Sequence, residues 1–216
     1  FKQLNLITQV TPAVVVNGSG VNVSDFNVVP LPLDNTHKIR ISFLLIARLL
    51  GDKGVREFAA AAAIIKQSNP EVEFHLVGWI DENPAAISQQ ELDHWVAEKT
   101  VNYWGKLSDV RPAIAESSIY VLPSYREGTP RTVLEAMAMG RAIITTDAPG
   151  CRETVVDGEN GYLVPVKSVE SLVEAMRKFI DDPELAEKMG QRSREIALTK
   201  YDVHEVNKHM MMEMEI

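Results

Sequence analysis

The order of short apolar runs and helical segments constrains the fold of this chain more than any other feature of its sequence. Short apolar runs lie at 39–47, 73–78, 101–104, 119–122, 142–146 and 162–164. Segments with apolar residues at helical spacing lie at 55–66, 88–99, 108–116, 130–139, about 152–156, 168–180, 183–199 and 203–214. Alternation of strands and helices indicates parallel strands, because each helix returns the chain to the same edge. The pattern predicts an α/β fold, a doubly wound parallel six-stranded sheet with helices on both faces.

The composition is that of an ordinary globular domain. Of the 216 residues, 45% are hydrophobic and 24% are charged, which is enough for one well-buried core. The formal net charge of −8 argues against a nucleic-acid-binding protein, whose binding face is usually basic. The sequence contains no run of about 18 apolar residues, so it predicts no membrane span. The single cysteine, Cys151, favours a reducing compartment, and we expect the cytoplasm.

The stretch at 124–149, SYREGTPRTVLEAMAMGRAIITTDAP, predicts a loop that follows a strand and opens a helix. We expect Thr129 to cap this helix and Pro130 to occupy its first position. A helix N-terminus at the carboxyl edge of a parallel sheet binds phosphate groups well. Glu127 and Glu135 lie on either side of that end. Their carboxylates could accept hydrogen bonds from the hydroxyls of a sugar and a ribose.

A second loop brings two cations to the same edge. Arg48 and Lys53 lie in ARLLGDKG at 47–54, directly after the first apolar run, together with Gly51. Cations at this place would stabilise negative charge that grows on a leaving diphosphate. The alternative is that both are solvated loop charges with no role in binding.

The motif E-G-x-P-x-x-x-x-E-A, at 127–136, resembles the signature of the retaining glycosyltransferases of family 4, which have the two-domain GT-B architecture. The resemblance extends from about residue 13 to the end and is strongest to enzymes of bacterial capsule and other surface polysaccharide biosynthesis. It implies a Rossmann-like donor-binding half. It also implies that Glu127 meets the donor sugar, that Glu135 meets the ribose, and that Arg48 and Lys53 hold the phosphates.

The resemblance gives two sets of expected site residues. The catalytic residues would be Arg48, Lys53 and Glu127. The donor-binding residues would be Gly51, Gly105, Leu107, Gly128, Thr129, Pro130, Arg131, Thr132, Val133 and Glu135. Trp104 precedes Gly105 and is equally well explained as a core residue, and His75 is expected to be a buried histidine of the core. We expect no metal and no cofactor besides the nucleotide-diphosphate sugar as substrate.

The resemblance also divides the chain into three parts. Residues 1–37 would be an interdomain linker or the remnant of an N-terminal domain, 38–200 the nucleotide-sugar-binding domain, and 201–216 a C-terminal helix. The G-x-G at 18–20 begins a nicotinamide-cofactor fingerprint, but Val23 replaces its third glycine and no helical period follows. The chain opens with Phe1 rather than methionine, so we expect a fragment that lacks the acceptor domain and transfers sugar poorly by itself.

The implied activity is transfer of a sugar from a nucleotide-diphosphate sugar, with retention, to a lipid-linked or glycan acceptor. Its partners would be the nucleotide sugar, the missing N-terminal domain and the acceptor, in the cytoplasm or peripherally at the inner face of the membrane. Two alternatives stay open: a sugar-nucleotide epimerase of the same architecture, and a non-catalytic nucleotide-binding module. The base, the sugar and the acceptor cannot be read from the sequence.

Overall fold

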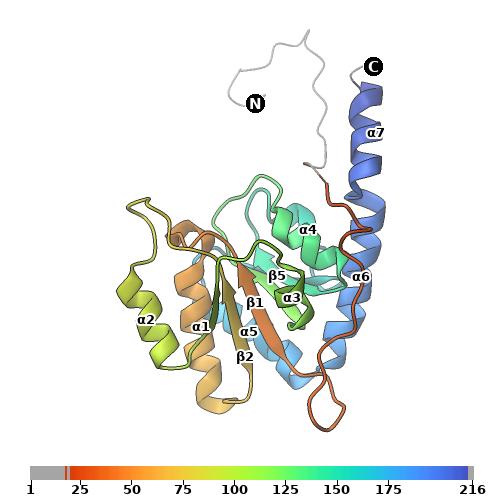
Figure 1. Cartoon of the computed structure of the whole chain (residues 1–216). Coiled ribbons are helices and arrows are strands. Elements are labelled where there is room, and N and C mark those ends of the chain that lie inside the picture. Colours follow the sequence, from red (N-terminus) through yellow and green to blue (C-terminus); the bar gives the residue numbers. More distant parts are fainter. Residues whose placement is uncertain (1–17, 19, 214–216) are drawn as a thin grey trace.

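The computed structural model describes residue 18 and residues 20–213, which form a parallel six-stranded sheet in the order β3-β2-β1-β4-β5-β6 (Figure 1). Every neighbouring pair of strands is parallel, as the sequence predicts. The strands are β1 (Ser42–Ile46), β2 (Glu73–Val77), β3 (Asn102–Gly105), β4 (Ile119–Leu122), β5 (Ala142–Thr146) and β6 (Gly161–Val164).

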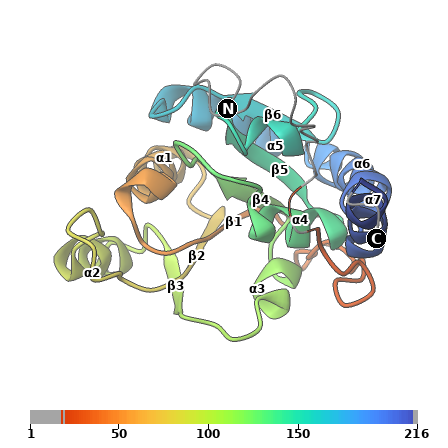
Figure 2. The same ribbon diagram turned by 90° about the horizontal axis from the view of Figure 1, so that it is seen from above.

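Helices cover both faces of this sheet, as Figure 2 shows. They are α1 (Val55–Ser68), α2 (Gln89–Ala97), α3 (Arg111–Ala115), α4 (Arg131–Ala138), α5 (Val169–Asp181), α6 (Glu184–Lys200) and α7 (Val203–Glu213), with 3₁₀ turns η2 (Gly51–Lys53) and η3 (Arg152–Thr154). Residues of α1 and α5 contribute to one hydrophobic cluster, and residues of α3 and α4 contribute to the other. The sheet is therefore doubly wound, which confirms the predicted fold class.

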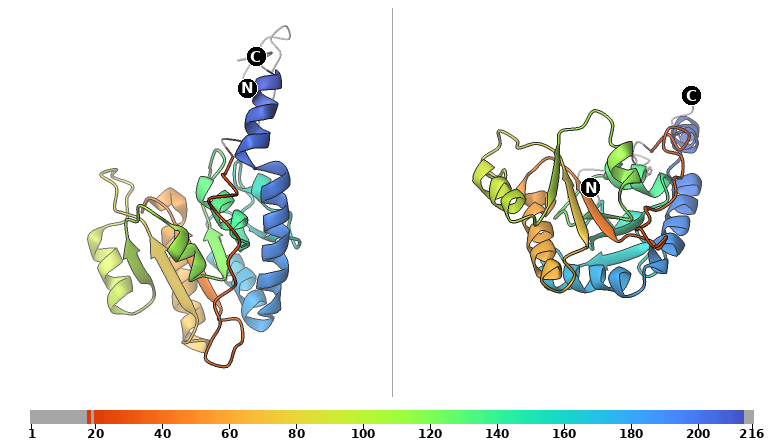
Figure 3. Two further views of the ribbon diagram at one scale, coloured as in Figure 1. Left: turned by 45° about the vertical axis from the view of Figure 1, so that its right-hand side comes forward. Right: turned by 60° about the horizontal axis from the view of Figure 1, so that its bottom comes forward.

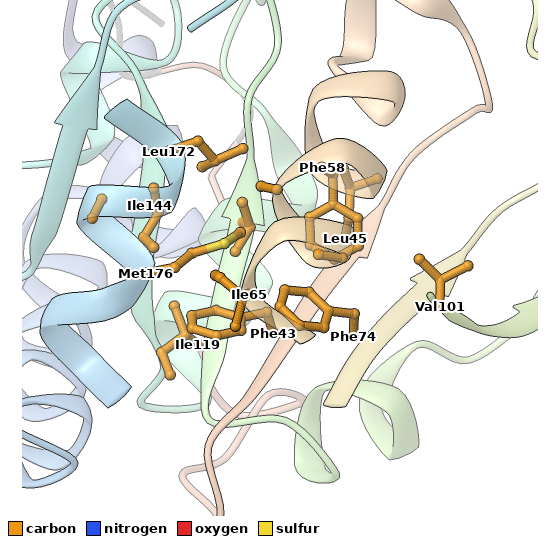
Figure 4. Packing of buried hydrophobic residues seen from close by; sticks show 14 of the residues in the cluster. Phe43, Leu45, Phe58, Ile65, Phe74, Val101, Ile119, Ile144, Leu172 and Met176 are labelled. Atoms are coloured by element: carbon orange, nitrogen blue, oxygen red, sulfur yellow. The ribbon is translucent and has the colours of Figure 1, made fainter. Parts of the chain in front are cut away.

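The continuous apolar run of the first strand reflects burial on both faces. Phe43 and Leu45 belong to the cluster beneath α1 and α5, whereas Leu44 and Ile46 belong to the cluster beneath α4. Successive side chains of a strand point to opposite faces, so a strand covered on both sides needs apolar residues throughout. Phe43 stacks on Phe74 of β2 with ring centroids 5.2 Å apart (Figure 4).

The segment before β1 is attached to the domain by two arginines. Residues 20–31 run beside α6 (Figure 3), and the N–H of Val21 donates to the carbonyl of Tyr201 at 2.8 Å. Arg141 is fully buried and donates to the carbonyls of Val29 at 2.9 Å and Pro30 at 3.3 Å. The second arginine, Arg194, donates to the carbonyls of Val23 and Phe26. Burial lowers the pKa of Arg141 to about 10.

Helix α4 begins differently from the prediction. It starts at Arg131, and Pro130 takes the N-cap position with an extended backbone and no side-chain cap. The expectation that Thr129 caps the helix is therefore wrong. The carbonyl of Pro130 accepts the first hydrogen bonds, from the N–H groups of Val133 and Leu134, so the turn closes without Thr129. Residues 1–17 and Ser19, which include the beginning of the expected linker and part of the G-x-G, lie outside the described residues.

Candidate functional site

The candidate site lies where the strand order of the sheet changes direction. Strands β2 and β3 lie on one side of β1, and β5 and β6 lie on the far side of β4. In doubly wound sheets the ligand crevice forms at such a point, outside the carboxyl ends of the strands. The loops that leave these ends are 47–54 after β1 and 123–130 after β4. These are the two loops that carry the residues expected to act in catalysis.

Lys53 and Glu127 meet across this point. Lys53 ends the η2 turn, and its Nζ lies 2.6 Å from Oε1 of Glu127 in the loop after β4. Each side chain is only 16% exposed, so the ion pair is largely shielded from water. The structure therefore brings together one of the expected cations and the first of the expected carboxylates, although they are far apart in the sequence.

Backbone contacts fix the relative position of the two loops. The N–H of Tyr125 donates to the carbonyl of Asp52 at 2.8 Å, and the hydroxyl of Ser124 donates to the same carbonyl at 3.1 Å. Gly54 has a positive φ of 71°, and a Cβ at this position would lie 2.2 Å from the carbonyl oxygen of Pro123. Only glycine permits such a close approach together with this backbone conformation. The Lys53–Glu127 pair is therefore held by two interlocked loops.

A third loop supports Glu127 from the other side. The N–H of Glu127 donates to the carbonyl of Pro149 at 3.0 Å. Gly150 also has a positive φ, and a Cβ there would lie 2.1 Å from the carbonyl oxygen of Glu127. The loop after β5 thus fixes the backbone of Glu127. The space beside Gly128 is open to the described part of the chain, since a Cβ at Gly128 would meet none of those residues within 4 Å.

Glu135 lies in the second turn of α4 and is buried, with 5% of its surface exposed. Its Oε1 accepts a hydrogen bond from Nε of Arg131 at 2.9 Å. Burial raises the pKa of Glu135, and the positive charge of Arg131 opposes part of that increase. Tyr120 of β4 feels both glutamates: burial is the main cause of its raised pKa, and the charges of Glu135 and Glu127 add to it. Both carboxylates therefore lie close enough to this buried side chain to disfavour its ionisation.

Arg48 lies at the same edge but has a different partner. Its Nη1 contacts Oδ2 of Asp81 at 3.2 Å, and its side chain is 51% exposed. Asp81 belongs to the loop after β2, which is joined to the loop after β1 by backbone hydrogen bonds from Leu49 to Trp79 and from Ile87 to Leu49. Sequence reasoning missed Asp81. The available signal was its position as the first acidic residue after the second strand, at the edge where ligands bind.

The other expected donor residues differ in what they offer a ligand. Arg131 is exposed, and Gly105 has a positive φ with open space beside its Cα. The N–H of Gly51 is taken by the carbonyl of Ala85. The hydroxyl of Thr132 accepts a hydrogen bond from Tyr120, and Val133 is fully buried in the core, so its side chain does not reach the crevice.

The remaining expected residues are half-buried or belong to the core. Leu107 and Trp104 are partly buried against the cluster that contains α4. The indole Nε1 of Trp104 donates to Nδ1 of His75 at 3.2 Å, and burial lowers the pKa of that histidine. His75 is 5% exposed, which confirms it as a core histidine. Trp104 thus has a structural role in holding His75.

A hollow of about 790 Å³ lies at the opposite edge of the sheet. It is lined by residues 37–39, by Asp182 at the end of α5 and by the beginning of α6, including Glu187 and Lys188. These side chains carry both signs of charge, and ligands of parallel sheets bind outside the carboxyl ends of the strands rather than the amino ends. We therefore place the candidate site at the carboxyl edge.

The chain matches the family model described as Glycosyl transferases group 1 over residues 35–196. The N,N'-diacetylbacillosaminyl-diphospho-undecaprenol alpha-1,3-N-acetylgalactosaminyltransferase of Campylobacter jejuni is 36% identical over 159 residues, which are 74% of this chain and 40% of that protein. The solved C-terminal domain of the group 1 glycosyl transferase LpcC from Francisella tularensis is 26% identical, with a TM-score of 0.70, covering 84% of this chain and 98% of that one.

The structure of Anabaena HepE in complex with UDP-glucose has the same fold, with a TM-score of 0.75 and 22% identity over 91% of this chain and 56% of that one. The present chain spans 40% to 49% of the lengths of three curated relatives. Within the described part of the chain, the helices are too short or too polar to cross a bilayer.

Proposed function

This chain belongs to the group 1 glycosyl transferases, and we propose that it is the nucleotide-sugar-binding part of a retaining glycosyltransferase. Residues 38–200 form the donor-binding domain in this proposal, with 201–216 as a terminal helix. The enzyme transfers a sugar from a nucleotide-diphosphate sugar to a lipid-linked or glycan acceptor. The family membership favours glycosyl transfer over the epimerase and the non-catalytic module.

The observation that carries this proposal is the shielded Lys53–Glu127 ion pair at the point where the strand order reverses. A diphosphate placed there lies against the N-terminus of α4, whose backbone dipole favours negative charge. The ammonium of Lys53 adds a donor from the other loop. Open space beside Gly128 lets a ligand approach the backbone of the loop closely. This arrangement suits a group with a diphosphate at its centre.

The carboxylates then act on the two ends of the donor. Glu127 accepts hydrogen bonds from the hydroxyls of the sugar, and Glu135 accepts them from the ribose, because an ionised carboxylate is a pure acceptor. As the bond between the sugar and the diphosphate breaks, negative charge grows on the diphosphate oxygen. Lys53, Arg48 and the end of α4 stabilise that charge, which lowers the barrier for departure of the leaving group.

The acceptor is proposed from the relatives. The name of the Campylobacter protein describes transfer to a sugar on diphospho-undecaprenol, a lipid. We place the full-length enzyme of the present chain at the cytoplasmic face of a membrane, where such a lipid-linked acceptor is accessible. The acceptor-binding domain would be supplied outside these 216 residues, so the chain alone should bind donor and transfer it poorly.

Calorimetry with the purified chain tests the donor site. UDP-, GDP- and ADP-linked sugars are titrated into the wild type and into Arg48→Ala and Glu135→Ala. We expect binding of at least one donor and an affinity loss of about tenfold in each variant, the size of one lost charge-assisted contact. Unchanged affinity in both variants would rule out these assignments. Rapid sugar transfer by the 216-residue chain to an added acceptor would contradict the proposed division of labour.

A further inference from the structure

We infer that Glu127 makes the site select the intact nucleotide sugar over the free nucleoside diphosphate, by occupying Lys53 whenever no sugar is present. This inference rests on the proposed function and adds a way to release product. The same carboxylate that contacts the sugar would thereby weaken binding of the diphosphate that transfer leaves behind.

The geometry of the ion pair carries the first step. Nζ of Lys53 and Oε1 of Glu127 are 2.6 Å apart, and each side chain is 16% exposed. A pair so shielded is weakened less by water and salt than a surface pair. The contacts of Gly54 and Gly150 fix the backbones on both sides, so the two side chains stay within reach of each other. A diphosphate must therefore compete with Glu127 for the ammonium.

An intact donor avoids most of this competition. Its sugar hydroxyls donate to the carboxylate of Glu127, which keeps that oxygen satisfied when Lys53 turns toward the phosphate. The sugar thus bridges the two like charges, the carboxylate and the diphosphate, that would otherwise repel each other.

Transfer removes that bridge. The bond between the anomeric carbon and the terminal phosphate oxygen breaks, and the oxygen keeps the electron pair. The acceptor hydroxyl oxygen forms the new bond to the anomeric carbon, and its proton passes to the diphosphate or to water. The nucleoside diphosphate is more negative than the donor until it is protonated, and Glu127 has lost its hydroxyl partners. Recapture of Lys53 by Glu127 and repulsion between the carboxylate and the phosphates then favour release.

The other cations of this edge are in a different position. Arg48 is 51% exposed and lies 3.2 Å from Asp81, and Arg131 is 74% exposed beside Glu135. Arg48 can turn toward a ligand with little loss, because half of its side chain is already in water. Glu135 is buried, but the ribose proposed to satisfy it is present in both the donor and the product, so the Arg131–Glu135 pair does not discriminate between them. The selection between donor and product is therefore assigned to Glu127, whose partner is shielded.

Calorimetry on the 216-residue chain measures this selection. The probes are UDP and UDP-N-acetylgalactosamine, with the GDP and ADP pairs titrated in parallel. Glu127→Gln keeps the shape of the side chain and removes its charge. We expect the variant to bind the nucleoside diphosphate about three- to tenfold more tightly and the nucleotide sugar more weakly than the wild type. The control is Glu174→Gln on α5, which makes the same change in net charge at an exposed site. The affinities of this control variant for the nucleoside diphosphate and for the nucleotide sugar should stay at the wild-type values.

A double-mutant cycle tests whether the effect passes through Lys53. In a Lys53→Met background, Glu127→Gln should lose most of its effect on diphosphate affinity, because the group over which the two anions compete is gone. Equal changes in the affinities for diphosphate and sugar donor in Glu127→Gln would overturn the inference and leave the proposed function intact. Absence of binding by the wild type for all six nucleotides would overturn both.

Discussion

Replacement of Gly54 by alanine should destabilise the chain and disturb the site together. Gly54 connects η2 to α1 with a φ of 71°, and its Cα faces the carbonyl of Pro123 in the neighbouring loop. A Cβ would lie 2.2 Å from that oxygen, and contacts under 3.0 Å are essentially not seen for real Cβ atoms. The two loops would have to separate at the place where Lys53 and Glu127 meet.

The expected loss in the free energy of unfolding has two parts. A left-handed backbone costs about 1 kcal/mol for alanine relative to glycine. Forcing an extra methyl group against a fixed backbone atom costs roughly 1–3 kcal/mol more. We therefore expect Gly54→Ala to lose about 2–4 kcal/mol, measured by urea unfolding at neutral pH. Nucleotide affinity should also fall, since the ion pair loses its fixed geometry.

Gly158→Ala is the matched control for this change. Gly158 has a similar φ of 79°, but a Cβ there would meet no atom of residues 18 and 20–213 within 4 Å. The backbone cost is shared between the two variants, and the steric cost belongs to Gly54 alone, so Gly158→Ala should lose only about 1 kcal/mol. Equal losses in the two variants would show that the contact with Pro123 carries no energy, and that the loops are not interlocked as described.

Two further predictions concern buried charges. Arg141 is fully buried and donates to the carbonyls of residues 29 and 30, and Arg141→Met removes this donor. The substitution should lower the free energy of unfolding by about 3 kcal/mol. A loss below about 1 kcal/mol in urea unfolding would contradict the role of Arg141 in attaching residues 29–30. Glu135 has a raised pKa in the folded state, so the folded protein binds the proton of this carboxyl more tightly than the unfolded protein does. The free energy of unfolding of the wild type, relative to that of Glu135→Gln, should therefore fall as the pH rises from 4.5 through the raised pKa, and then level off. Parallel pH profiles of the two proteins would refute the raised pKa.

The sequence predicted the sheet well because burial on both faces leaves a direct trace. Phe43 and Leu44 are adjacent but pack into opposite clusters, so both must be apolar. The apolar run at 39–47 can therefore be recognised from the sequence alone. The same reasoning could not find the start of α4. Thr129 satisfies the usual rule for a cap, but Pro130 occupies that position because its extended backbone and free carbonyl begin the helix directly.

The ion-pair and hydrogen-bond partners of the charged residues could not be predicted from the sequence. The spacing placed Arg48 at the correct edge, yet its partner Asp81 depends on how the loop after β2 joins the loop after β1. Arg141 and Arg194 were passed over because arginines are expected on the surface. Their role follows from backbone carbonyls of residues 23–30, which have no chemical signature in the sequence.

The three cations proposed to act at the carboxyl edge are each neutralised by a neighbouring carboxylate. Lys53 pairs with Glu127, Arg48 with Asp81 and Arg131 with Glu135, so each of the three cations proposed to act at the donor site has its own carboxylate. Such neutral pairs exert little attraction beyond a Debye length of about 8–10 Å, and the chain as a whole carries a net charge of −8. A diphosphate would therefore gain little from long-range steering and must bind by exchanging partners at short range. Selectivity follows from that exchange at the two shielded carboxylates, because only a ligand that satisfies Glu127 and Glu135 can displace their cations without leaving a buried charge uncompensated.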